Sequence, residues 1–487
     1  SFRYRLLPQD AVALRFRVDG FRVLQGDRLV ALDLTTRAAR QWLAQAAKDD
    51  LQSVAYALTG ILRPDDCEAL KKLKDNRLLI EVAAPFYPDI AAALPEINPA
   101  GLILSYAYPA RNDFEDKDLA SLAKLSLTLL ELGSCSELND VSALSDLTRL
   151  TALSLGNCEG VRELPALERL TQLRLMTLGG CRKLQSLAPL AGLPALNRLS
   201  LWGLPAVQDC SSVKKLPGLT DLSLPEEVTE AQLADILRAV PGLISLSLSA
   251  KNLASLAPLT GLQSLYSLNV SACEAVSDLA PVGQLSNLVS LSLVGSKANA
   301  GLPSFERLPR LTVLSVSGFA RIRDLSGLAK LRLGSLTLSS CEQLSDITAL
   351  WGIETLQQLN LGYCPAVTEV SVLERLARLT LLDLGGCERL VRLEPLAKLD
   401  SLVSLNLYGC KQLSDLGPLA RLPQLASLRL GGYPNAIRDL RPLAGLAGLQ
   451  KLEVYANDEI TALGPLAGLK RLVSLDISGC KTVSDFG

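Results

Sequence analysis

The chain has 487 residues, of which 48% are hydrophobic, and its 49 basic and 50 acidic side chains leave a net charge of −1. Because a near-neutral chain lacks the field that attracts polyanions, we expect neither a nucleic-acid partner nor a membrane partner. The sequence contains no histidine, which excludes the usual general base and the commonest metal ligand, so we expect no enzyme, no cofactor and no metal.

Residues 1–75 are predicted to form a small α+β module. The hydrophobic pattern indicates strands over residues 13–17 and 21–34, with a turn at residues 25–27, and then a helix over residues 35–62. A repeat array leaves an apolar end that must be covered, and we expect this module to be the cap of such an array.

Two short apolar segments follow the module, residues 79–82 and residues 102–104. We interpret both as irregular first strands of a repeat array that begins near residue 76. An acidic insert, residues 111–118, separates them from the regular part.

From about Leu127 onward the sequence repeats itself with a period near 23 residues. The shared pattern is L-x-x-L-x-L-x-x-C-x-x-L-x-D-L-x-P-L-A-x-L, and it is clear over residues 150–170 and 402–422. Of the fifteen intervals between cysteine positions, eleven are 23 residues long, two are 22 and two are 24. We name this cysteine position the ladder position; its sixteen residues are Cys135, Cys158, Cys181, Leu204, Glu227, Lys251, Cys273, Ser296, Phe319, Cys341, Cys364, Cys387, Cys410, Tyr433, Asn457 and Cys480.

This pattern resembles the leucine-rich-repeat family, whose consensus L-x-x-L-x-L-x-x-N/C-x-L it matches. The second half of the unit, read as DLAPVGQL at residues 278–285 and DLGPLARL at residues 415–422, is similar to the short repeats of bacterial internalins. The cysteine is more similar to cysteine-containing repeats and to the repeats of plant intracellular immune receptors. The resemblance implies an architecture and leaves the ligand open.

The implied fold is an α/β, right-handed solenoid with a curved parallel sheet on its concave face. In L-x-L the two leucines point inward, and the residues between them point to the concave surface. A 23-residue unit leaves room for only a turn or a short 3-10 segment on the convex side, although residues 229–240 have helical spacing. The predicted domains are the cap, residues 1–75, and the solenoid, residues 76–487, with two irregular and about sixteen regular units.

Nine of the eleven cysteines occupy the ladder position. In the family this side chain points inward and hydrogen-bonds the backbone that leaves the strand, and we expect the same here. Stacking places the Cα atoms of neighbouring ladder cysteines about 5 Å apart, but parallel Cβ vectors give poor disulfide geometry. A row of four thiols spans roughly 14 Å, which is too long for one zinc ion. So many free thiols indicate a reducing compartment, either the cytoplasm or, for a delivered effector, the host cytosol.

Cys67 is the basis of an enzymatic alternative. Some bacterial effectors that join leucine-rich repeats to a ubiquitin-ligase domain use a cysteine beside acidic residues, and Cys67 follows Asp65 and Asp66 at the start of a predicted helix. The helix dipole would lower the pKa of this thiol, whereas the two carboxylates would raise it. A packed helix cysteine is the simpler interpretation.

The concave residues lie two, four and six positions before each ladder residue, and eighteen of these forty-eight positions are serine. The middle of the array, around Ser247 and Ser292, therefore lacks the Tyr, Trp and Arg that anchor protein interfaces. Aromatic and charged residues gather in the carboxy-terminal quarter, where ordinary surface polarity is the alternative explanation. The predicted partner-binding residues are Tyr363, Asp383, Asn406, Tyr408, Arg429, Tyr433, Lys451, Glu453, Tyr455 and Asp476, together with the concave Trp202.

We therefore expect a non-catalytic scaffold that binds a protein partner on its concave face. By resemblance it would be the sensor part of an intracellular immune-type receptor or a bacterial effector; the alternatives are a ubiquitin-ligase-like effector acting through Cys67 and a purely structural assembly. No run approaches the ~18 apolar residues of a membrane span, and residues 1–10 lack the apolar core of a signal peptide. Because the chain starts at Ser1, a removed targeting segment stays compatible with the sequence.

Overall fold

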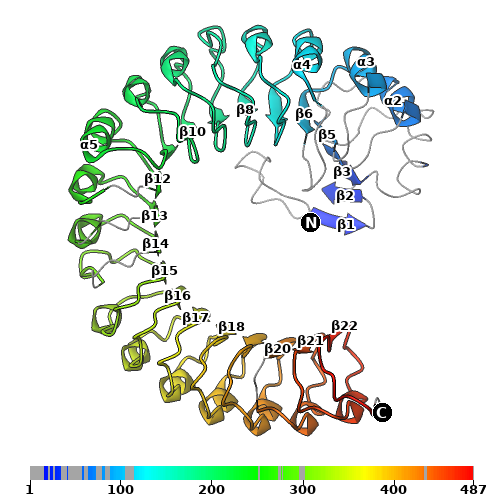
Figure 1. Ribbon diagram of the computed structural model, residues 1–487, viewed down its shortest axis with the longest axis vertical. Coiled ribbons are helices and arrows are strands. Elements are labelled where there is room, and N and C mark those ends of the chain that lie inside the picture. Colours follow the sequence, from blue (N-terminus) through cyan, green and yellow to red (C-terminus); the bar gives the residue numbers. More distant parts are fainter. Residues whose placement is uncertain are drawn as a thin grey trace. The chain divides into compact units, whose positions relative to one another are not determined.

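A computed structural model shows two compact units, residues 1–227 and residues 228–487. The residues that the structure describes are 16–19, 22–25, 28–33, 41, 57–59, 64–72, 79–82, 88–104, 114–249, 253–271, 276, 278–295, 302–432 and 436–485. Within each unit the strands line the inner edge, and the helical segments lie on the outer side (Figure 1).

The first unit opens with an antiparallel hairpin and continues as a parallel sheet. β1 pairs antiparallel with β2 and β2 with β3, whereas each later strand pairs parallel with the next one along the chain. Its strands are β1 (Phe16–Asp19), β2 (Arg22–Gln25), β3 (Arg28–Asp33), β4 (Ala57–Thr59), β5 (Leu79–Val82), β6 (Gly101–Leu104), β7 (Leu129–Leu132), β8 (Ala152–Ser154), β9 (Leu175–Thr177), β10 (Arg198–Ser200) and β11 (Asp221–Ser223). Its α-helices are α2 (Pro64–Lys71), α3 (Pro88–Ile97) and α4 (Asp116–Leu122), and its 3-10 helices are η3 (Ser142–Asp146), η4 (Ala188–Gly192) and η5 (Ser211–Lys215).

The amino-terminal predictions are partly confirmed. The hairpin, the helix at Cys67 and the strands β5 and β6 form as expected. The predicted helix over residues 35–62 is wrong at residues 57–59, because these form β4, which lies between β3 and β5 and pairs with both. Apart from residue 41, the rest of this predicted helix lies outside the described residues. Strand pairing in the sheet therefore overrides local helical spacing here. That residues 1–75 form a separate cap and residues 76–487 the solenoid stays a prediction.

The second unit begins with α5 (Glu230–Ala239) and continues as a parallel sheet. Its strands are β12 (Ser245–Ser249), β13 (Ser267–Ser271), β14 (Ser290–Val294), β15 (Val313–Ser317), β16 (Ser335–Ser339), β17 (Gln358–Asn360), β18 (Leu381–Asp383), β19 (Ser404–Asn406), β20 (Ser427–Gly431), β21 (Lys451–Tyr455) and β22 (Ser474–Asp476). Its 3-10 helices are η6 (Ala257–Gly261), η7 (Ala280–Gln284), η8 (Ser326–Leu328), η9 (Thr348–Gly352), η10 (Ser371–Arg375), η11 (Glu394–Lys398), η12 (Gly417–Arg421), η13 (Arg441–Leu443) and η14 (Gly464–Leu466).

The L-x-L pattern produces the core of each unit. In β14, for example, Leu291 and Leu293 are at most 1% exposed, whereas the serines beside them face outward. The alternation follows from the two-residue period of a strand, which sends successive side chains to opposite faces. The leucines of each repeat then pack against those of the next, so the core is one continuous layer within a unit.

The Asp of the D-L-x-P-L segment starts the 3-10 helix of the outer side. Asp278 Oδ1 accepts a hydrogen bond from the backbone N–H of Ala280 at 2.8 Å, and Asp415 Oδ1 accepts one from Gly417 at 2.7 Å. An Asp side chain that binds the backbone two residues on forms an Asx turn, which fixes the direction in which the chain leaves the core. The predicted 3-10 outer side is confirmed.

The predicted helix over residues 229–240 is also confirmed as α5. Thr229 caps it: the Thr229 hydroxyl accepts from the backbone N–H of Gln232, and the Gln232 side chain accepts from the backbone N–H of Thr229. Leu233, Ile236 and Leu237 are buried on its inner face. Within the described ranges, no helix is both long enough and apolar enough to cross a bilayer.

Candidate functional site

Two groups of strands in the second unit present different concave surfaces. The serine face is the concave side of β12 to β16, and eleven of its fifteen positions are serine, with no charged residue among them. The strands β18 to β22 carry the aromatic and charged residues instead. The strands pair in the same parallel register under both surfaces. The inward residue positions of these strands are leucine or valine in both groups, so the two groups differ in their concave side chains.

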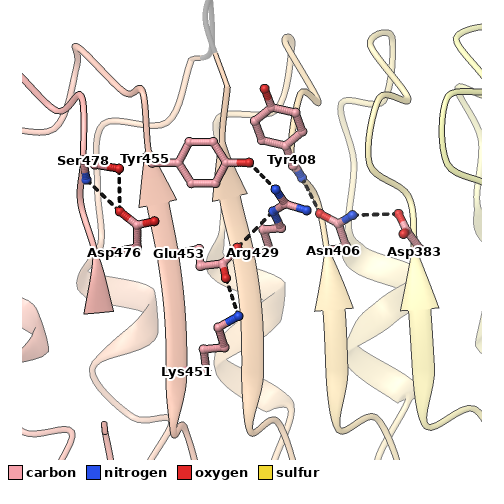
Figure 2. A network of polar contacts seen from close by, with 9 residues as sticks. All are labelled: Asp383, Asn406, Tyr408, Arg429, Lys451, Glu453, Tyr455, Asp476 and Ser478. Carbon is pink, nitrogen blue, oxygen red and sulfur yellow. Dashed lines mark hydrogen bonds and ion pairs between the residues drawn. The ribbon is translucent and has the colours of Figure 1, made fainter. Parts of the chain in front are cut away.

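Five of the predicted residues form one contiguous group, which we name the tyrosine–arginine cluster: Tyr408, Arg429, Lys451, Glu453 and Tyr455. Tyr408 follows β19, Arg429 lies on β20, and the other three lie on β21 (Figure 2). Parallel pairing places Arg429 directly beside Glu453. A spacing of 24 residues in the sequence thus becomes direct contact across two strands.

Arg429 is the centre of the cluster. Its Nε lies 3.0 Å from Glu453 Oε2, and its Nη2 donates a hydrogen bond to the Tyr455 hydroxyl. The guanidinium carbon lies 5.0 Å from the centroid of the Tyr408 ring and 5.3 Å from that of the Tyr455 ring. Such distances allow cation–π attraction to both rings, so ionic, hydrogen-bond and aromatic contacts all hold one side chain in place.

The two tyrosines also stack on each other. Their ring centroids are 5.1 Å apart and the ring planes differ by 23°. Lys451 completes the group by pairing its Nζ with Glu453 Oε1. Glu453 therefore receives one cation on each oxygen, and its side chain is only 18% exposed while Arg429 and Lys451 are 44% and 53% exposed.

Asp383, Asn406 and Asp476 have a different task, which sequence reasoning missed. Each side chain accepts a hydrogen bond from the backbone N–H two residues on, at 2.8 Å, 3.0 Å and 2.9 Å respectively. These Asx turns shape the chain where it leaves β18, β19 and β22. An Asn or Asp in the last position of a short strand is the signal that could have revealed them, and Asn360 on β17 follows the same rule.

The same side chains extend the cluster in both directions. Asn406 Nδ2 donates to Asp383 Oδ1 at 2.9 Å, and the backbone N–H that Asn406 binds belongs to Tyr408. On the other flank, hydrogen bonds from the hydroxyl and the backbone N–H of Ser478 lower the pKa of the Asp476 carboxyl. Ser478 is a further member of this region that the sequence did not single out (Figure 2).

Tyr363 lies two repeats before Tyr408 and is 61% exposed. Its backbone has φ of 60°, a left-handed conformation that glycine adopts in most other repeats at this position. A Cβ added to Gly386 would come within 2.8 Å of its ring, so the ring occupies the space that the glycine leaves. Tyr408 lies against Gly432 in the same way. Tyr433, another predicted residue, lies outside the described residues.

Trp202 belongs to the first unit, whereas the other ten predicted residues belong to the second. It is 46% exposed, and its indole fills the space beside Gly179 so closely that a side chain added there would displace it. The structure thus brings together the tyrosine–arginine cluster and its Asx-turn neighbours, and Trp202 is a separate feature of its own unit.

The ladder thiols point inward and bind the backbone, as expected. Each of six donates a hydrogen bond to a backbone carbonyl oxygen 26 positions earlier, at the end of the strand in the preceding repeat. The six bonds are 2.8 to 3.3 Å long and join Cys158 to Leu132, Cys181 to Leu155, Cys364 to Leu338, Cys387 to Leu361, Cys410 to Leu384 and Cys480 to Val454. Burial raises the pKa of Cys181 and of Cys410 to about 12. These thiols have a structural role; Cys273 lies outside the described residues.

The enzymatic alternative finds little support in the geometry. Cys67 is 2% exposed in α2, and the adjacent Asp66 is 5% exposed. A nucleophile must reach its substrate, and a side chain buried to this degree cannot do so without rearrangement. In the part of the chain that the structure describes, no three His, Cys, Asp or Glu side chains are grouped to hold a metal.

This fold is shared with a protein of known structure. No protein-family model matches the sequence, and no curated protein matches it. Among solved structures, TLR13 in complex with ssRNA13 is similar over 93% of this chain and 80% of its own, with 18% identity and a TM-score of 0.50. The functional domain of InlJ from Listeria monocytogenes, which includes a cysteine ladder, matches over 72% of each chain with 20% identity and a TM-score of 0.47. Internalin C2 from the same organism is 27% identical over 46% of this chain and 83% of its own, with a TM-score of 0.31.

Proposed function

We propose that this leucine-rich-repeat chain is a non-catalytic scaffold that binds a protein partner through the concave residues of β18 to β22. The tyrosine–arginine cluster is the observation that carries the proposal. Tyr and Arg are, with Trp, the residues enriched among the anchors of protein interfaces. Tyr buries much area for little loss of conformational freedom, and Arg offers several charge-assisted hydrogen bonds.

The internal contacts of the cluster favour recognition over ordinary surface polarity. An isolated exposed arginine must be ordered by its partner, at a cost of about 0.5–1.5 kcal/mol for the side chain. Arg429 is already ordered by Glu453 and by the two tyrosine rings. A partner that contacts it therefore meets a fixed surface.

Charge favours a protein over a nucleic acid as the partner. TLR13 has a structure with single-stranded RNA, so a similar fold can hold a polyanion. This chain has a net charge of −1, and its charged concave residues in β18 to β22 comprise two cations and three anions. Binding of nucleic acid depends on neutralising many phosphates, for which this surface has too few cations.

We further propose that the protein works in a reducing compartment, either the cytoplasm or, for a delivered effector, a host cytosol. The many buried ladder thiols support this proposal, since structural thiols persist where disulfides do not form. Both roles, the sensor of an immune-type receptor and the effector, would use the concave surface to bind a protein.

Affinity capture from native cytosol, read by quantitative mass spectrometry, tests the proposal. The wild-type chain and the Ser247→Ala/Ser292→Ala variant should enrich the same protein, and Tyr408→Ala/Tyr455→Ala should lose it. Circular dichroism should show all three chains equally folded, because concave side chains support no core. Equal capture by the tyrosine variant, or loss in the serine variant, would show that the binding surface lies elsewhere.

A further inference from the structure

We propose that the tyrosine–arginine cluster recognises a carboxylate on its partner. The inference rests on the proposed function, since it names the chemistry through which the partner would be held. It follows from three features of the cluster: which polar groups are already satisfied, which are exposed, and how firmly they are held.

The carboxylate acceptors of the cluster are used internally, whereas donors remain. Glu453 has Arg429 on one carboxylate oxygen and Lys451 on the other. Arg429 has five N–H groups, and within the described residues its contacts occupy Nε and one position on Nη2. The Nη1 end of the guanidinium and the remaining protons of Lys451 are left for a ligand.

The cationic side chains of the cluster are also more exposed to a ligand than the anionic one. The two cationic side chains are 44% and 53% exposed, and the anion between them is 18% exposed. The three groups together carry one positive charge, so the accessible part of the cluster is cationic although the whole surface is nearly neutral. A partner approaching from the concave side meets nitrogen donors before it meets the Glu453 oxygens.

The geometry of Arg429 suits a planar anion. A guanidinium presents parallel N–H groups that match the two oxygens of a carboxylate, and such charge-assisted pairs are stronger than neutral hydrogen bonds. Contact with the rings of Tyr408 and Tyr455 restricts the movement of the fork. Figure 2 shows the guanidinium beside both tyrosines, with the Tyr455 hydroxyl directed at it.

Short capped peptides test the carboxylate directly, without knowledge of the partner. The probes are Ac-Gly-Glu-Gly-NH2, its neutral match Ac-Gly-Gln-Gly-NH2, and Ac-Gly-Gly-Gly-OH, which carries a terminal carboxylate. The full chain is labelled with ¹⁵N-arginine, and the Arg429 Nε–Hε resonance is identified by its loss in Arg429→Lys. We expect the glutamate peptide to shift this resonance saturably and to bind about tenfold more tightly than the glutamine peptide.

Variants separate the cluster from general surface charge. Lys451→Gln should weaken the response several-fold, and the exposed Arg378→Gln, outside the cluster, should leave it unchanged. A response to the terminal carboxylate alone would assign the ligand group to a chain end, and a response to the glutamate peptide would assign it to an acidic side chain.

Equal shifts from the glutamate and glutamine peptides, or no shift at about 50 mM of either carboxylate peptide, would overturn the inference. The capture experiment keeps that failure apart from failure of the proposed function. If Tyr408→Ala/Tyr455→Ala still loses the partner while the carboxylate peptides have no effect, the scaffold proposal stands and the carboxylate is wrong.

Discussion

The serine face and the tyrosine–arginine cluster occupy the same unit and the same kind of strand, yet they differ in almost every outward side chain. On the serine face, polar contacts are few and neutral, such as Ser317 Oγ to Ser339 Oγ at 2.7 Å. In the cluster, one arginine is held by an ion pair, a hydrogen bond and two rings. The comparison shows that the L-x-L core and the concave surface vary independently, so the surface can change without a change of fold.

The largest expected effect tests whether the leucine cores beneath the serine face and the tyrosine–arginine cluster contribute equally to stability. Leu291 on β14 and Leu405 on β19 are 0% and 1% exposed. Leu291→Ala and Leu405→Ala should each lower the free energy of unfolding by about 2–5 kcal/mol, because each leaves a cavity. Urea titration followed by circular dichroism measures both. A much larger loss for one of them would show that the cores beneath the two surfaces are not alike.

The next effect concerns binding. Arg429→Glu should weaken binding of the captured partner by more than ~2 kcal/mol, since it removes a central anchor and reverses its charge. Ser292→Ala, at the equivalent position of a repeat on the serine face, should change the binding free energy little. Isothermal titration calorimetry gives both values, and the opposite ranking would place the partner on the serine face.

A smaller effect is expected from the Asx turns. Asn406→Ala removes the acceptor of the Tyr408 N–H and the donor to Asp383, so it should cost about 1 kcal/mol of stability. Ser315→Ala on the serine face should stay within about 0.5 kcal/mol. Thermal unfolding measures the pair, and equal values would mean that the turn at β19 forms without the side chain.

The smallest effect is a dependence on acid. The backbone N–H and the hydroxyl of Thr348 lower the pKa of the Asp346 carboxyl. Its contribution to stability is complete above the unfolded pKa of about 4 and is lost as the pH falls through the lower native value. Asp346→Asn keeps the acceptor and removes the titration. The melting temperature of this variant should therefore fall less between pH 6 and pH 2 than that of the wild type. If the two proteins show the same dependence of melting temperature on pH, the lowered pKa of Asp346 does not stabilise the fold.

Much of this organisation could be predicted from the sequence. The 23-residue period placed β7 to β22 because each L-x-L segment has only one register in which all leucines are buried. The same register placed Arg429 beside Glu453, since both lie four positions before a ladder residue. Periodicity failed where the repeat is irregular: β4, α3 and α4 carry no ladder signal, and their positions depend on pairing and packing with neighbours.

The chemistry of the candidate site was less accessible. A concave position says which face a side chain occupies, but it does not say which rotamer the side chain adopts. The contact of Arg429 with two tyrosines and the Asx turn of Asn406 depend on such rotamers. Composition could therefore locate the cluster without revealing that Asn406 shapes the backbone that carries Tyr408.

The ladder thiols also bear on how the chain is made. Each of the six donates to a carbonyl oxygen 26 residues before it, and none of the six reaches forward. A repeat that emerges from the ribosome therefore finds the acceptor for its cysteine already synthesised one turn earlier. Contacts of such short sequence separation close quickly, and stacking can proceed in step with translation. In these six repeats the cysteine thus fastens new chain onto chain that has already been synthesised.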